Sequence, residues 1–140
     1  MKKHPHLEKA TNKYKAPVLE NQIHFAIARY LDLVIKQPSR WHTVEVSNQQ
    51  KGRAGMFKQI ALKKKGCRTG WPDITVYNKI YIEDYPSAFQ MIFFEVKIPG
   101  KDAEPHQKAL HDELREDGHY VFVVHSVEEV EKILKDLGVV

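Results

Sequence analysis

The spacing of hydrophobic positions changes several times along the chain, and each change marks an expected element. Between Pro17 and Pro38, apolar residues recur every three or four positions, which predicts a helix. Residues 41–46 alternate between apolar and polar side chains, as a half-buried strand does. A short basic helix is expected over residues 56–65, ended by Gly66.

Short, nearly continuous apolar runs in the second half are typical of buried strands. Residues 73–77 predict one strand and residues 91–97 another, and the second has the composition of a central strand. The stretch between them, residues 78–90, is longer than a tight hairpin needs. We therefore expect a hairpin connection with decoration of its own between the two strands.

A strand–helix–strand unit follows from the next pattern. A helix is expected over residues 102–117 with Asp102 as its N-cap, and a strand over residues 119–125. Such a unit pairs its two strands in parallel through a right-handed crossover. A last helix should begin after Ser126. The chain is therefore expected to be an α/β protein with a mixed β-sheet flanked by helices, in the order α-β-(α)-β-β-α-β-α.

The composition fits one ordinary domain, because the chain has 140 residues of which 42% are hydrophobic. Lysine-rich residues 1–16 predict a flexible basic arm, so the folded domain is expected over residues 17–140. No apolar run approaches the ~18–20 residues of a membrane helix. The single cysteine, Cys67, excludes an intrachain disulfide and a cysteine-based zinc site. Together these features predict a cytoplasmic protein.

The net charge is only +4, but the positive charge is concentrated in particular segments of the chain. Residues 51–68, which we call the basic segment, contain seven bases and no acid: Lys51, Arg53, Lys58, Lys63, Lys64, Lys65 and Arg68. A clustered positive field favours a polyanion such as nucleic acid. A solvated lysine-rich helix would have the same composition. The basic segment is therefore a candidate nucleic-acid-binding surface.

Two charged residues occupy a strand that should be buried. Side chains alternate across a strand, so Glu95 and Lys97 share one face with Phe93. Burying both charges is costly unless something compensates them. An ion pair between them at the strand end would do so, and so would a metal ion bound by the carboxylate.

Three more polar residues allow both a structural and a functional interpretation. Asp73 follows a Gly-x-Pro turn, where aspartates commonly bind backbone amides. Glu20 lies in the first turn of the expected helix, where it suits the helix dipole. Gln107 shares a helix face with Leu110 and needs hydrogen-bond partners near the sheet. Together with Glu95, the carboxylates form an oxygen donor set without thiolate, which favours Mg²⁺ or Mn²⁺ and phosphodiester hydrolysis.

The order of these motifs resembles the PD-(D/E)xK nucleases. The motifs are Gly70-Trp71-Pro72-Asp73, then Glu95-Val96-Lys97, then Gln107 in the following helix. Within that superfamily the chain most resembles the VRR-NUC family, from about residue 18 to the last helix. The resemblance implies a restriction-endonuclease-like fold and a Mg²⁺- or Mn²⁺-dependent deoxyribonuclease.

The resemblance also implies residue roles. Asp73, Glu95 and the carbonyl of Val96 would bind the metal, and Lys97 would serve the nucleophilic water. Glu20 would contact metal or water, and Gln107 would orient its neighbours. Trp71 departs from the aliphatic residue expected at its position.

Stand-alone members of the family are small phage and bacterial proteins that act on branched DNA, notably four-way junctions. The resemblance therefore implies structure-selective cleavage, in a bacterial or phage-infected cell, and the twofold symmetry of a junction suits a homodimer. Two other functions remain open from the sequence. One is a non-catalytic nucleic-acid-binding module. The other is an accessory subunit in repair or replication that docks a partner through the acidic helix 102–117.

Overall fold

The computed structural model describes residues 5–44 and 52–140, which contain both helices and strands. The elements, in chain order, are α1 (Pro5–Val34), β1 (Arg40–Thr43), α2 (Gly52–Lys64), β2 (Ile74–Ile82), β3 (Tyr85–Val96), α3 (Pro105–Glu116), β4 (Tyr120–Val124) and α4 (Val127–Asp136). None of the helices in these ranges has the length and apolar character that a membrane crossing requires.

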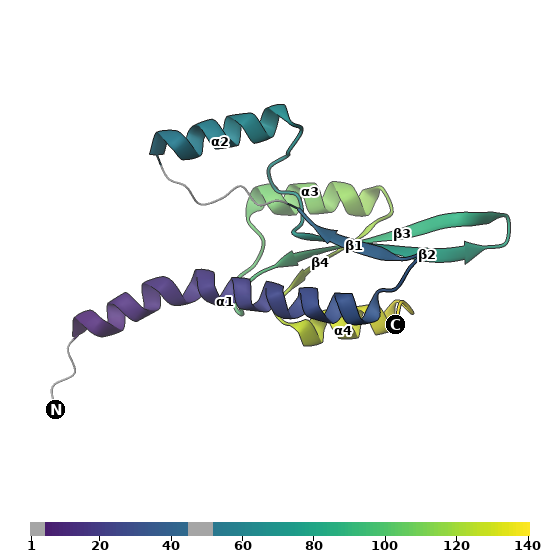
Figure 1. Cartoon of the computed structure of the whole chain (residues 1–140), viewed down its shortest axis with the longest axis horizontal. Helices are drawn as coiled ribbons and strands as arrows, with labels where there is room; N and C mark the ends of the chain where they lie inside the picture. The colour runs from purple at the N-terminus through teal and green to yellow at the C-terminus, as the bar shows by residue number, and fades with distance from the viewer. Residues whose placement is uncertain (1–4, 45–51) are drawn as a thin grey trace.

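The strands form one mixed sheet in the order β1-β2-β3-β4 (Figure 1). The pairs β1–β2 and β2–β3 are antiparallel, whereas β3 and β4 are parallel and joined through α3. This arrangement confirms the predicted α/β fold and the strand–helix–strand unit. It also makes β3 a central strand, as its apolar sequence predicts.

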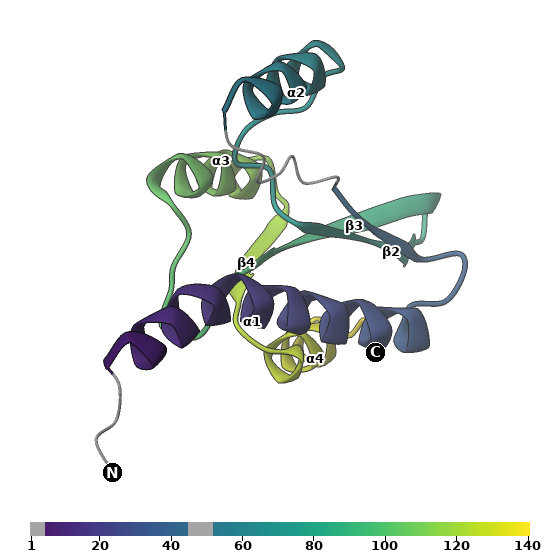
Figure 2. The same cartoon turned by 60° about the vertical axis from the view of Figure 1, so that its left-hand side comes forward.

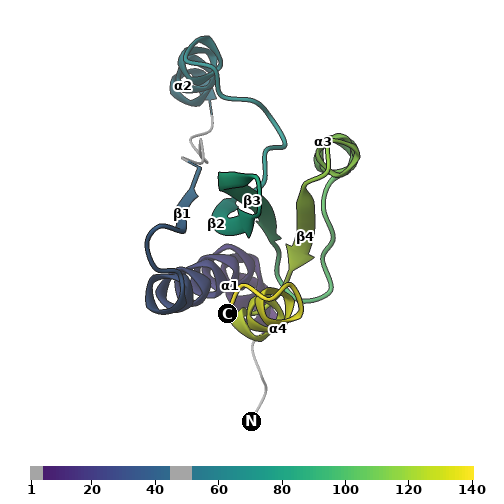
Figure 3. The same ribbon diagram turned by 90° about the vertical axis from the view of Figure 1, so that its right-hand side faces the viewer.

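The two faces of the sheet bury different side chains. One face carries Ile74, Val76, Ile92, Phe94 and Val96, which pack with residues of α1 and α4 in the main core. On the other face, a smaller cluster joins Phe93 and Val121 to α3. Figure 3 shows the sheet between α3 and the pair α1 and α4. Because side chains along β3 point alternately to the two faces of the sheet, every second residue from Phe93 onward faces α3.

A hairpin joins β2 and β3 as predicted, but the decorated connection expected over residues 78–90 is wrong, because both strands continue through most of it. Asn78 pairs with Gln90 and Ile80 with Ala88, so β2 and β3 form one long hairpin that extends beyond the other strands (Figure 1). The half-exposed hairpin mixes polar and apolar side chains, so the alternation of apolar and polar positions that marks a strand is weak in its sequence. A hydrogen bond of 3.3 Å from Asn78 Nδ2 to Gln90 Oε1 joins two of its polar side chains.

Helix ends also differ from the sequence prediction. α1 begins at Pro5 rather than Pro17, and α2 begins at Gly52 rather than residue 56. The N-cap of α3 is Glu104, not Asp102. Asp102 instead accepts a hydrogen bond from the Ala103 amide at 2.7 Å and forms an exposed ion pair.

Parts of two other expectations have no structural test. The division into a basic arm over residues 1–16 and a domain over residues 17–140 stays a prediction. The last two residues of the strand expected over 41–46 lie outside the described residues.

Candidate active site

Two carboxylates face each other where β2 begins and β3 ends. The register pairs Ile74 with Phe94, so Asp73 lies opposite Glu95 on the sheet face that α3 covers. Directly opposite residues of antiparallel strands have Cβ atoms roughly 4.5–5.5 Å apart. Asp73 is fixed in place because its Oδ2 accepts a hydrogen bond from the Val96 amide at 2.8 Å.

Glu95 is almost completely buried, with 2% of its surface exposed. Its Oε1 accepts a hydrogen bond from Gln107 Nε2 at 2.9 Å and lies 3.6 Å from Lys97 Nζ. Its Oε2 has no hydrogen-bond partner among the described residues. A buried carboxylate oxygen without a donor is costly, so this oxygen is suited to bind a cation.

Burial also changes the acidity of Glu95. Desolvation raises the pKa of the Glu95 carboxyl to about 8, the charge of Asp73 raises it as well, and Lys97 opposes both effects. Ionising Glu95 beside Asp73 would add a second negative charge that one lysine does not offset, and for this reason the proton is held to higher pH. A divalent cation would favour the ionised form of both carboxylates.

Lys97 and Glu20 complete the charged groups at this end of the sheet. Lys97 is largely buried, with 15% of its side chain exposed. Glu20 comes from α1, where burial raises the pKa of its carboxyl, Lys97 lowers it and Asp73 raises it. α1 therefore carries Glu20 near enough to Asp73 and Lys97 for their charges to act on its carboxyl.

Gln107 connects Glu95 to the start of α3. Its Oε1 accepts a hydrogen bond from the Glu104 amide at 2.8 Å, while its Nε2 donates to Glu95. A side chain fixed at both ends holds the carboxylate in one orientation. The first turn of α3 therefore positions Glu95, and the partly buried Gln107 amide is satisfied by doing so.

Gly70 lets the loop before Asp73 approach α3. Its φ is +87°, and a Cβ at this position would lie 3.2 Å from the carbonyl oxygen of His106 and 3.5 Å from the Cα of Gln107. Glycine tolerates both the positive φ and the lack of space for a Cβ. The next residue, Trp71, packs edge-on against Phe93 with ring centroids 5.8 Å apart, so the bulkier residue is accommodated on the α3 face.

His111 belongs to the site although the sequence did not single it out. It is 1% exposed, and its Nε2 lies 3.6 Å from Glu95 Oε2 with no hydrogen-bond partner among the described residues. Burial lowers the pKa of His111, and the charge of Arg115 lowers it too, which favours a neutral ring. The sequence feature that points to His111 is its spacing of four residues from Gln107, which puts both side chains on one helix face.

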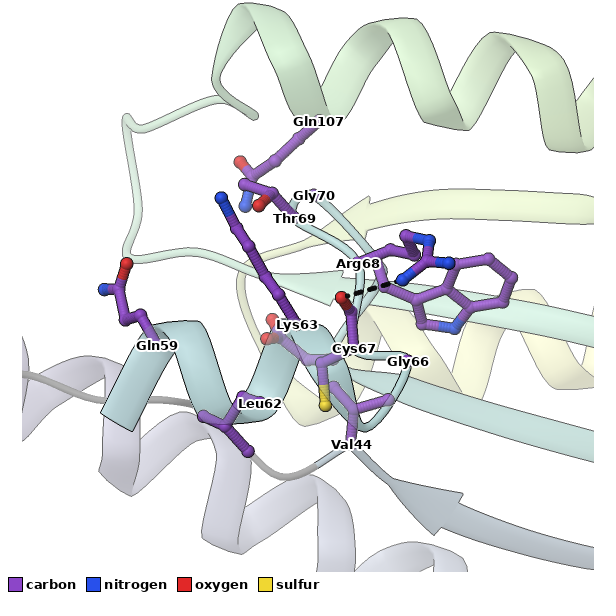
Figure 4. Close-up of a pocket in the computed structure, with 12 residues that line it drawn as sticks. Val44, Gln59, Leu62, Lys63, Gly66, Cys67, Arg68, Thr69, Gly70 and Gln107 are labelled. Carbon is purple, nitrogen blue, oxygen red and sulfur yellow. Dashed lines mark hydrogen bonds between the residues drawn. The ribbon is translucent and has the colours of Figure 1, made fainter. Parts of the chain in front are cut away.

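A pocket of about 620 Å³ leads from Asp73 toward the basic segment. Asp73 and Gln107 lie in its wall together with Lys63, Arg68 and Thr69. Figure 4 shows the Lys63 side chain extending from α2 toward Gln107. The cavity therefore joins the predicted chemistry to the predicted DNA-binding surface.

The basic segment is only partly represented in that wall. Besides Lys63 and Arg68, its described members are exposed and do not line the pocket: Arg53, Lys58, Lys64 and Lys65. Lys51 lies outside the described residues. The structure thus brings two of the predicted DNA contacts to the site.

The donor atoms fit Mg²⁺ or Mn²⁺. The Lys97 amide donates to Val124 on β4 at 2.9 Å, whereas the Val96 amide points to Asp73. The amide and carbonyl of one strand residue point to the same side, so the Val96 carbonyl also faces Asp73. Oxygen donors from two carboxylates and a carbonyl suit a hard cation.

No group of three His, Cys, Asp or Glu side chains in the described ranges forms a metal cluster by itself. Mg²⁺ does not need one, because it commonly binds through one or two carboxylates and takes waters and substrate phosphate as its other ligands. Asp73 and Glu95 are sufficient protein carboxylates for such a site. The ligand roles of these residues remain predictions.

Comparison with known proteins gives one match. The family model described as the VRR-NUC domain matches residues 18–128. No curated protein and no solved structure matches the chain. The matched range includes every described residue named above as part of the carboxylate site, from Glu20 to His111.

Proposed function

Because the chain belongs to the VRR-NUC family, a family of nucleases that process DNA, we propose that it is a Mg²⁺- or Mn²⁺-dependent DNA endonuclease. The observation that carries the proposal is the buried Glu95, which faces Asp73 and lies beside Lys97. A nucleic-acid-binding surface does not need a buried acid, whereas metal-assisted hydrolysis does. Glu95 therefore favours a catalytic role over simple binding.

Asp73, Glu95 and the Val96 carbonyl hold the cation in this proposal. A divalent cation at such a site neutralises charge on the scissile phosphodiester and lowers the pKa of an attacking water. Gln107 keeps Glu95 in position through its 2.9 Å hydrogen bond. The Val96 amide does the same for Asp73.

Lys97 and Glu20 act on the attacking water in this proposal. The Lys97 ammonium donates a hydrogen bond to the water oxygen and fixes its direction of approach. The Glu20 carboxylate, on the α1 side, accepts a hydrogen bond from the same water and can take its proton. A raised pKa of Glu20 makes its carboxylate a stronger base than an exposed glutamate.

DNA reaches this site along the basic segment. Lys63 and Arg68 line the pocket that contains Asp73, so they can contact phosphates that flank the scissile one. Such contacts supply affinity independently of sequence. A pocket open to a basic helix fits a substrate larger than one nucleotide.

We further propose branched DNA, in particular a four-way junction, as the preferred substrate. A junction has twofold symmetry and must be cut twice, so two copies of the chain suit it. The homodimer is part of this proposal, as is a role in repair or replication in a bacterial or phage-infected cell.

The experiment compares labelled duplex, flap and four-way junction DNA, each incubated with Mg²⁺, Mn²⁺ or EDTA. Cleavage is expected with either metal, with the junction cut fastest, and no cleavage in EDTA. Cleavage in EDTA at the rate seen with Mg²⁺ would refute the metal mechanism. Binding of all three substrates without any cut would instead support the non-catalytic module.

The accessory-subunit alternative depends on the acidic surface of α3. Part of that acidity is already neutralised within the chain, because Arg115 pairs with Asp112 at 3.2 Å and Lys108 pairs with Asp102 at 2.8 Å. These exposed pairs leave a weaker negative surface than the sequence indicates. No described contact favours this alternative over the nuclease.

A further inference from the structure

Helix α2 stands apart from the rest of the molecule in all three views (Figures 1, 2 and 3). It nevertheless exposes large apolar side chains. Met56 is 55% exposed, Phe57 is 58% exposed and Ile60 is 43% exposed. We call these three residues the apolar strip. An exposed cluster of this kind commonly marks a contact surface.

The apolar strip lies next to the wall of the active-site pocket. With 3.6 residues per turn, Met56, Phe57 and Ile60 share one side of α2. Lys63 follows Met56 by seven positions, so it lies on the adjoining edge, and Lys63 lines the pocket with Asp73. A ligand in the pocket can therefore extend over the strip.

The charges around the strip are all positive. Arg53 is one turn before Phe57, and Lys64 is one turn after Ile60, on the same side of the helix. The basic segment contains no acidic residue. A partner with apolar faces and negative charges fits this arrangement. Unstacked nucleobases flanked by phosphates have both.

A second copy of the strip fits less well. Packing α2 against α2 would bring Arg53 and Lys64 against their own equivalents, which repel. The area is also small, because even a whole aromatic side chain buries only about 150–250 Å² and about half of each side chain of the strip is already covered. Three such side chains on each of two copies supply less than the roughly 1,200–2,000 Å² of a stable interface.

We propose that the apolar strip of α2 binds unstacked nucleobases at the branch point of the DNA substrate. Phe57 offers its ring to a base, as aromatic side chains do in sequence-tolerant recognition. Met56 and Ile60 contact the neighbouring step, as apolar wedges do at distorted DNA. Intact duplex hides its base faces, so the strip recognises the branch and not the paired arms. This inference rests on the proposed function, because it assigns part of the substrate of the same site.

The test measures binding in Ca²⁺, which suppresses cleavage, with a four-way junction that carries 2-aminopurine at its centre and with a duplex of the same length. Phe57→Ala should weaken junction binding by roughly tenfold or more, as expected for the loss of a stacking aromatic. Duplex binding should stay within about twofold, and the 2-aminopurine signal of the bound junction should change. The matched control is Phe25→Ala on α1, a phenylalanine that is 62% exposed, which should leave both affinities unchanged.

Several outcomes would overturn the proposal. One is equal loss of junction and duplex binding in Phe57→Ala, and another is unchanged junction binding. A third is a fall in oligomeric state, measured by sedimentation, which would assign the strip to a second copy. Wild-type cleavage of the junction in Mg²⁺ is measured in parallel. If the wild type cleaves the junction but Phe57→Ala does not change junction binding, only the role of the apolar strip is refuted. If Phe57→Ala weakens junction binding but the wild type does not cleave, only the proposed nuclease activity is refuted.

Discussion

His111 Nε2 and Glu95 Oε2 lie 3.6 Å apart, and neither atom has a hydrogen-bond partner among the described residues. Both side chains are almost fully buried. Gln107 binds the other carboxylate oxygen of Glu95. Glu95 therefore has one oxygen fixed by a hydrogen bond from α3 and one oxygen that lies near His111 without a hydrogen bond among the described residues.

Removing the His111 side chain should both lower the stability of the protein and disturb the position of Glu95. His111→Ala leaves a cavity beside a buried carboxyl, and we expect the free energy of unfolding to fall by about 1–3 kcal/mol, measured by urea denaturation. Metal-dependent cleavage should fall as well, because Glu95 gains freedom. His106→Ala on the exposed side of α3 is the control, with a change within about 0.5 kcal/mol. Equal effects of the two variants would show that His111 has no special relation to Glu95.

Lys97 should matter for turnover and not for metal affinity. Lys97→Met removes the ammonium that lies 3.6 Å from Glu95, and we expect the single-turnover rate to drop by roughly 10²-fold. Metal binding, measured by calorimetry, should persist because lysine is not a ligand. Lys101→Met, an exposed lysine four residues further on, should cleave as the wild type does. A fully active Lys97→Met would reduce Lys97 to an ion-pair partner.

Gly70 offers a test of the approach between its loop and α3. Gly70→Ala adds a Cβ 3.2 Å from the His106 carbonyl oxygen at a φ of +87°. Gly100→Ala is a matched control, because its φ of +84° is the same but nothing lies within 4 Å of the added Cβ. The control should lose about 1–2 kcal/mol from backbone strain alone, and Gly70→Ala should lose more and also cleave more slowly. Equal losses in both properties would contradict the close approach.

Metal binding should release a proton from Glu95. With a pKa of about 8, the Glu95 carboxyl is largely protonated near pH 7 without metal, and a bound cation requires it ionised. Mg²⁺ affinity should therefore rise as the pH increases toward about 8 and level off above it. Calorimetry in two buffers of different ionisation enthalpy measures the protons released, and Glu95→Gln should release none. Wild-type binding without proton release would contradict the raised pKa.

Much of the site follows from local patterns. Alternation along residues 91–97 puts Glu95 and Lys97 on one face, and helical spacing turns Gln107 toward the sheet. Antiparallel pairing then brings Asp73 opposite Glu95, because both lie at the same end of the hairpin. These relationships depend only on the period of each element and on which strands are neighbours.

Other features depend on tertiary placement, which no local pattern contains. The charges of Asp73 and Lys97 reach Glu20 only because α1 packs on the sheet. His111 comes within 3.6 Å of Glu95 only because α3 packs on that face of the sheet. The start of α3 was misplaced because Asp102 has the composition of a cap but uses its oxygens elsewhere. Interactions distant in sequence decide the first two cases, whereas the partners of Asp102 are the nearby Ala103 and Lys108.

The most direct test of the central claim separates cleavage from binding in Asp73→Asn. This variant keeps the size of the side chain but removes the charge opposite Glu95, and Asp112→Asn on the exposed side of α3 is its control. Four-way junction binding is measured in Ca²⁺ and cleavage in Mg²⁺ for both variants and the wild type. We predict that Asp73→Asn binds within a few-fold of the wild type but loses cleavage by at least roughly 10³-fold, a loss of about 4 kcal/mol in transition-state stabilisation, while Asp112→Asn is unchanged. Cleavage by Asp73→Asn at the wild-type rate would contradict the assignment of this carboxylate pair as the active site.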